Sequence, residues 1–96
     1  MANGVIIPNP IKLKIVEIGG SSGSHNTTAV NFGNIATLTG ITGLNDRNIV
    51  SIEVINTILS PASILLASLY NNDLYIAASQ SCTRSSTISL KVTYNL

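Results

Sequence analysis

Charged residues are scarce in this chain. Lys, Arg, Asp and Glu make up 9% of its 96 residues and leave a formal net charge of +1, whereas charged residues usually contribute about 25%. The five basic residues are scattered, so they do not form the electrostatic footprint of a nucleic-acid-binding protein. Low charge gives a monomer little protection against association. The composition therefore favours a protein packed into a larger assembly over one that tolerates harsh surroundings.

Cysteine and histidine occur once each. Cys82 cannot form an internal disulfide or a cysteine-based metal cage, and we interpret it as a free thiol in a loop or at an edge. His25 lies in Gly19–Asn26 (GGSSGSHN), which we predict to be a flexible loop, so His25 is interpreted as a solvated loop histidine. No nucleophile, base and orienting acid can be assembled from the residues present. The sequence thus predicts no enzyme, no catalytic residue, no metal site and no cofactor.

The chain also lacks a long hydrophobic run. Its apolar stretches are far shorter than a membrane span, and its N-terminus has neither the charged region nor the apolar core of a signal peptide. We therefore expect no membrane insertion.

The chain does contain segments in which apolar and polar residues alternate, most clearly from Thr87 to Leu96. Five polar residues there alternate with five apolar ones, which are Ile88, Leu90, Val92, Tyr94 and Leu96. A side-chain period of two places all five on one face of a β-strand. We predict that this strand anchors the chain end in the core.

Other segments predict further short strands separated by turns. Pro8 and Pro10 make Val5–Pro10 an edge strand or an extended arm, because proline cannot donate to a sheet ladder. Gly40 and Gly43 argue against a helix in Ile35–Leu44, which we interpret as strand and turn. The clearest remaining strands are Ile11–Ile18, Ile49–Ile58, Ser63–Tyr70 and Leu74–Ala78. The expected fold is a single all-β domain, residues 1–96: an antiparallel β-sandwich, jelly-roll-like, with seven or eight short strands and no helix.

The segment Tyr70–Leu74 predicts a β-hairpin with a short Asn/Asp turn. Four side chains gather around its tip: Tyr70, Asn72, Asp73 and Tyr75. Aromatic faces beside amide and carboxylate groups could hold a sugar. In the alternative interpretation, the Asn and Asp residues make the turn and the tyrosines pack with their hydroxyls outward.

Surplus apolar strand faces point to a subunit interface. A 96-residue sandwich has a limited interior, and an interface would bury the remaining apolar surface. The predicted interface residues come from Ser63–Tyr70 or from the N-terminal arm: Ile64, Leu66, Leu69, Val5 and Ile7.

The segment Ile49–Leu96 resembles the C-terminal knob domains of bacteriophage fibre and appendage proteins. The resemblance lies in a strand IVSIEVINTI, a proline break, the hairpin LYNNDLYIAAS and a terminal strand TISLKVTYNL. It implies a β-sandwich that forms a homotrimer, belongs to an extracellular virion and can contact a host surface through a glycan or a protein. No fibrous shaft precedes the segment, so we expect an excised knob or a small virion protein.

Two other functions remain open. The chain could be a monomeric carbohydrate-binding module that uses the hairpin tip. It could also be an adhesin or pilin-type subunit that assembles by strand donation, with Val5–Ile18 as the donated strand.

Overall fold

The computed structural model describes residues 10–55 and 57–96. These residues form nine strands and one short helix, so the predicted all-β class is confirmed. The elements in chain order are β1 Lys12–Ile18, β2 Gly23–His25, β3 Val30–Asn34, α1 Ile35–Thr39, β4 Ile49–Ile55, β5 Leu59–Ser60, β6 Leu65–Tyr70, β7 Asp73–Ala78, β8 Cys82–Arg84 and β9 Ile88–Tyr94. Val5 and Ile7, two of the predicted interface residues, lie outside the described part of the chain, as does most of the predicted N-terminal arm.

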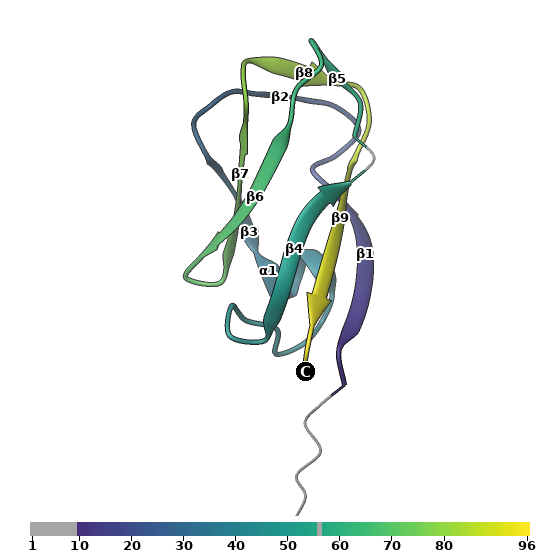
Figure 1. Cartoon of the computed structure of the whole chain (residues 1–96), viewed down its shortest axis with the longest axis vertical. Helices are drawn as coiled ribbons and strands as arrows, with labels where there is room; N and C mark the ends of the chain where they lie inside the picture. The colour runs from purple at the N-terminus through teal and green to yellow at the C-terminus, as the bar shows by residue number, and fades with distance from the viewer. Residues whose placement is uncertain (1–9, 56) are drawn as a thin grey trace, which may run out of the picture.

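The strands form three small antiparallel sheets with related strand orders: β1–β9–β4, β2–β8–β5 and β3–β7–β6. In each sheet the middle strand comes from the run β7 to β9, and its neighbours come from the runs β1 to β3 and β4 to β6. The three sheets are thus successive parts of one three-stranded ribbon that is folded over (Figure 1). We call β1–β9–β4 the first limb, β3–β7–β6 the second limb and β2–β8–β5 the bend.

The middle strands β7, β8 and β9 follow one another from Leu74 to Val92, and we call this continuous segment the central ribbon. The same alternation of buried and outward side chains runs along its whole length. Its even-numbered residues are buried in β7, β8 and β9, whereas Gln80 and Ser86, in the two connections, are exposed. A period of two therefore continues through both connections. The buried positions of this ribbon are Leu74, Ile76, Ala78, Cys82, Arg84, Ile88, Leu90 and Val92.

Side chains from the inner faces of both limbs form one hydrophobic core. Ile88, Leu90 and Val92 of the first limb, together with Leu74 and Ile76 of the second, are at most 1% exposed. Tyr94 and Leu96 pack against this cluster with partial burial. The predicted anchoring of the chain end by the terminal strand is therefore confirmed, and β9 occupies the centre of its sheet.

Strand β1 presents apolar side chains on both faces. Its pairing with β9 runs without a register shift from Lys12 to Ile18, so the apolar side chains on its two faces do not result from a β-bulge. Val16 and Ile18 point into the core. Ile11, just before β1, and Leu13 and Ile15 within it are more than half exposed, at 61%, 55% and 54%. We call these three residues the β1 row.

The segment after β3 was wrongly predicted to be strand and turn. It begins with the five-residue helix α1, whose N-terminus is capped by Asn34. The Asn34 side-chain oxygen accepts hydrogen bonds from the backbone N–H groups of Ala36 and Thr37, which have no partners within the helix. Gly40 ends the helix in a left-handed conformation with φ 71°, which glycine adopts without steric cost.

The segment Gly19–Asn26, predicted to be a flexible loop, instead contains the strand β2. This strand pairs at the bend with β8, with His25 opposite Cys82. His25 is buried, at 7% exposure, so the interpretation as a solvated loop histidine was wrong. Within the described residues no helix is long and apolar enough to cross a membrane.

Candidate functional site

The β6–β7 hairpin brings together most of the side chains that the sequence singled out. Asn71 and Asn72 form its two-residue turn, both with positive φ, at 50° and 65°. These are the signs that a type I′ turn requires, and asparagine tolerates them better than most residues. Tyr70 and Asp73 are therefore directly paired across the hairpin, and the predicted hairpin is confirmed.

Three of the four candidate glycan-binding residues lie on the outer face of the second limb. Tyr70 is 66% exposed, and its ring meets the Tyr75 ring edge-on, with centroids 6.4 Å apart and an interplanar angle of 71°. Asp73 and Tyr75 alternate with the buried Leu74, so they point away from the core. The hairpin thus places two phenol rings and a carboxylate on one surface.

Asn31, which no local sequence pattern indicates, links the polar groups of this surface. Its side-chain amide nitrogen donates to Asp73 Oδ2 at 3.1 Å and to the Tyr75 hydroxyl at 3.3 Å. Its side-chain oxygen accepts from the Gly33 N–H at 2.7 Å, which fixes the orientation of the amide. Asn31 and Tyr75 are register partners in the β3–β7 ladder, next to the bulge at Phe32. Only this long-range pairing could have identified Asn31.

Asn72, the fourth candidate, has a structural role in the turn. Its side-chain oxygen accepts a hydrogen bond from the Asp46 N–H at 2.9 Å, and its backbone carbonyl accepts from the Ile35 N–H at 2.8 Å. These bonds tie the hairpin tip to the start of α1 and to the loop before β4. The alternative interpretation, in which Asn72 makes the turn, describes this residue better.

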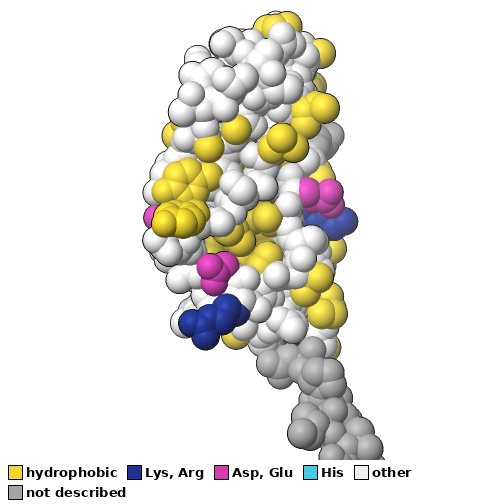
Figure 2. All heavy atoms as spheres, turned by 60° about the vertical axis from the view of Figure 1, so that its left-hand side comes forward, with side chains coloured by type: hydrophobic (Ala, Val, Ile, Leu, Met, Phe, Trp, Pro, Cys, Tyr) yellow, Lys and Arg dark blue, Asp and Glu magenta, His cyan; other side chains and the backbone are white. Residues whose placement is uncertain are grey.

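The predicted interface residues divide between the two faces of β6. Ile64 and Leu66 are exposed, at 64% and 63%, and both point outward; we call this pair the β6 row. Leu69 instead packs against the core. Figure 2 views the molecule from the side of the second limb and shows separate hydrophobic patches on a surface with few charged groups.

A second cluster lies inside the bend, around the buried Arg84. The guanidinium donates to the backbone carbonyls of Gly19, Gly20 and Ser86 and, through Nε, to His25 Nε2 at 2.9 Å. The His25 ring stacks on Phe32, with centroids 6.2 Å apart. Burial, and to a smaller extent the Arg84 charge, lowers the pKa of His25 from its usual 6.5. An accepting Nε2 requires neutral histidine with its proton on Nδ1, so this cluster is built for a neutral ring.

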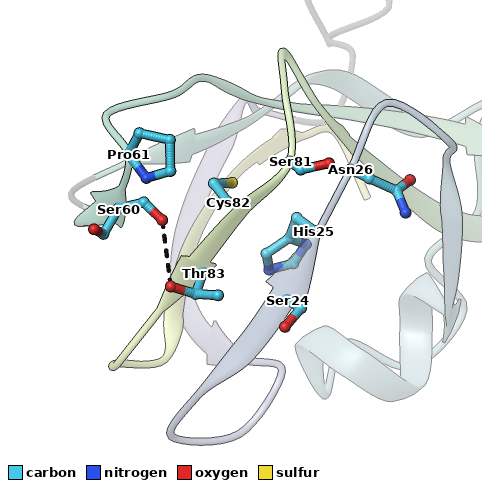
Figure 3. Close-up of a pocket in the computed structure, with 8 residues that line it drawn as sticks. All are labelled: Ser24, His25, Asn26, Ser60, Pro61, Ser81, Cys82 and Thr83. Atoms are coloured by element: carbon cyan, nitrogen blue, oxygen red, sulfur yellow. Dashed lines mark hydrogen bonds between the residues drawn. The ribbon is translucent and has the colours of Figure 1, made fainter.

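Outside this cluster the bend forms a shallow hollow of about 420 Å³. Figure 3 shows the surrounding side chains, which come from β2, β5, β8 and the connections beside them. Across the hollow, the Thr83 hydroxyl donates to the Ser60 carbonyl at 3.3 Å. The lining is mostly small and polar: Ser24, His25, Asn26, Ser60, Pro61, Ser81, Cys82 and Thr83. Cys82 has a free thiol, and it is buried in a strand rather than placed in a loop.

The described residues hold no group of three or more His, Cys, Asp or Glu side chains placed to bind a metal ion. Comparison of the chain with protein-family models, with curated proteins and with solved structures found no match.

Proposed function

We propose that this protein is a non-enzymatic structural and adhesive subunit of a virion, and that it forms a homotrimer as a phage fibre tip or decoration domain. The observation that carries the self-association is the pair of exposed apolar rows on the outer faces of the two limbs. The trimer and the virion rest on the resemblance of Ile49–Leu96 to fibre knobs.

The two rows suit contact between copies of the chain. A closed ring of subunits needs two different patches on each subunit, one to meet its neighbour on each side. The β1 row lies on the first limb and the β6 row on the second, and every side chain in the two rows is large, aliphatic and more than half exposed. We propose that the β1 row of one copy packs against the β6 row of the next.

Low charge supports the same arrangement. The described part of the chain contains one ion pair, Lys91–Glu53 at 3.2 Å, on the outer face of the first limb. Like-charge repulsion between copies would be small at a net charge of +1. Burying one large aliphatic side chain contributes about 1.5–3 kcal/mol, so two facing rows offer substantial stabilisation.

The folded ribbon also supports the finer assignment of the fold. Folding at the bend makes both limbs contribute to one core, as the two sheets of a sandwich do. A jelly roll is likewise a double-sheet antiparallel architecture without helical layers. We therefore propose a small β-sandwich of jelly-roll type.

Sedimentation velocity over a range of concentrations tests the assembly. We expect a species with three times the chain mass of 10.0 kDa. Leu13→Lys and Leu66→Lys should each raise the dissociation constant about tenfold or more, because each places an ammonium group in an apolar contact. Ile58→Lys is the matched control: Ile58 is 81% exposed but lies between β4 and β5, outside both rows. A wild-type chain that stays monomeric at high concentration would contradict the proposal.

A further inference from the structure

We propose that the outer face at the β6–β7 hairpin is a binding site for a neutral pyranose sugar. The site consists of Tyr70, Tyr75, Asp73 and Asn31. It rests on the proposed function only in that an adhesive tip would present this face to a host glycan, and its chemistry is independent of the oligomeric state.

Tyr70 supplies the apolar part of the site. Its ring is two-thirds exposed and contacts Tyr75 in an edge-on arrangement, the geometry that aromatic pairs favour. The contact positions the ring before any ligand arrives, and preorganisation reduces the entropic cost of binding. An exposed aromatic face can cover the C–H face of a sugar ring, which is the least polar part of that ligand.

Asp73 and Tyr75 supply the polar part. Because the Tyr75 oxygen accepts from Asn31, its O–H remains available as a donor. Asp73 Oδ2 also accepts from Asn31, whereas Asp73 Oδ1 has no hydrogen-bond partner within residues 10–55 and 57–96. The Tyr75 hydroxyl therefore offers a donor next to the charged acceptor of Asp73. Two adjacent hydroxyl groups of a sugar can accept from the first and donate to the second.

The charge of the site selects for a neutral ligand. No Lys or Arg of the described chain forms an ion pair with Asp73; the ion pair present joins Lys91 to Glu53. A uronic acid, a sialic acid or a phosphate would meet an unneutralised carboxylate, and like charges in contact are unfavourable. A neutral hexose or N-acetylhexosamine meets no such penalty and can donate a charge-assisted hydrogen bond to Asp73.

Amide chemical-shift titration of the ¹⁵N-labelled full chain tests the site directly. The probes are the methyl glycosides of glucose, galactose and N-acetylglucosamine, with methyl glucuronide as the acidic counterpart. We expect at least one neutral glycoside to shift the amides of Asn31, Tyr70, Asp73 and Tyr75, with weaker or no binding of the glucuronide. Tyr70→Ala and Asp73→Asn should each lower the affinity about tenfold, in line with loss of one aromatic contact or one charged hydrogen bond.

Asp46→Asn is the matched control, because Asp46 is an exposed acid beside the hairpin whose backbone, rather than its carboxylate, bonds to Asn72. This variant should bind like the wild type. The proposal is overturned if no neutral glycoside binds, or if Tyr70→Ala and Asp73→Asn bind as tightly as the wild type while retaining the wild-type spectrum elsewhere. Sedimentation of the same samples keeps this outcome separate from the assembly: a trimer that binds no sugar contradicts only the site, and a sugar-binding monomer contradicts only the assembly.

Discussion

Arg84 is a buried cation whose described partners include no carboxylate. It is 6% exposed, yet its four hydrogen bonds go to three backbone carbonyls and to the His25 ring. A guanidinium stays charged in proteins and has donors only, so each inward N–H needs an acceptor. Carbonyl oxygens and a neutral imidazole meet this need, which explains how the bend accommodates an arginine in a core position of the central ribbon.

This cluster makes stability depend on pH through His25. Its pKa is lowered in the folded state, so the unfolded chain binds a proton more readily than the folded chain. The contribution is complete above the unfolded value of about 6.5 and is lost as the pH falls toward the lower folded pKa. We expect urea denaturation to show a smaller free energy of unfolding at about pH 5 than at about pH 7.5.

His25→Gln provides the control for this prediction, because the glutamine side-chain oxygen can still accept from Arg84 but does not titrate. Its unfolding free energy should change less than that of the wild type over the same pH range. Equal pH dependence in the two proteins would assign the effect to the carboxylates instead.

At the level of elements, the connection between β1 and β2 is held in place, although its composition predicts a flexible loop. Gly19 and Gly20 both have positive φ, at 82° and 73°, and both carbonyls accept from Arg84. A Cβ added at Gly19 would lie 2.7 Å from Arg84 Nη2, whereas one added at Gly20 would meet nothing within 4 Å. The two glycines therefore form a matched pair.

Alanine substitution at these two positions separates backbone strain from the contact with Arg84. Gly20→Ala should lower the free energy of unfolding only through left-handed backbone strain, by about 1–2 kcal/mol. Gly19→Ala introduces a similar strain and also displaces Arg84, which should lower it by a further amount of about 1–3 kcal/mol. Thermal and urea unfolding should thus rank the wild type above Gly20→Ala and Gly20→Ala above Gly19→Ala. Equal destabilisation of the two variants would mean that Arg84 shifts aside without losing its bonds.

The elements show how far alternation can be used to predict this fold. The sequence predicts β9 and the β6–β7 hairpin, because alternation and the Asn-Asn turn are local signals. Strand β8 shows no clear alternation of apolar and polar residues. Its two buried residues are Cys82 and Arg84, and in the polar segment QSCTRSS neither indicates a strand. Helix α1 is not predicted because Gly40 and Gly43 argue against a helix in this segment, whereas in the structure Gly40 ends one. The Asn34 cap was the available signal for its start.

The candidate site could be predicted only in part, for a similar reason. Tyr70, Asp73 and Tyr75 are neighbours in the sequence, so the turn alone brings them together. Asn31 lies 42 residues before Asp73 and reaches the site through the pairing of β3 with β7, which local patterns do not encode. The inner position of Leu69 likewise depends on the register of β6 against β7, which pairs Leu69 with Leu74.

At the scale of the whole molecule, the folded ribbon uses apolar residues on more faces than one core requires. The inner faces of both limbs fill the core, and the outer faces still carry the β1 row and the β6 row. With 45% hydrophobic and 9% charged residues, the proposed contact between copies would be driven by burial of apolar surface and not by ion pairs.

This distinction predicts the salt dependence of the assembly. Added salt screens contacts between charged groups, because the Debye length is about 10 Å at 0.1 M and about 3 Å at 1 M. Apolar contacts are not screened, and excluded salts such as sulfate strengthen burial. We expect the dissociation constant from sedimentation to stay constant or fall between about 0.05 and 0.5 M sodium chloride, and to fall further in sodium sulfate of equal ionic strength. Leu13→Lys should remain the weaker associator in every buffer. Dissociation of the wild-type assembly on addition of sodium chloride would show instead that scattered charges such as Lys12, Arg47 and Asp46 hold the copies together.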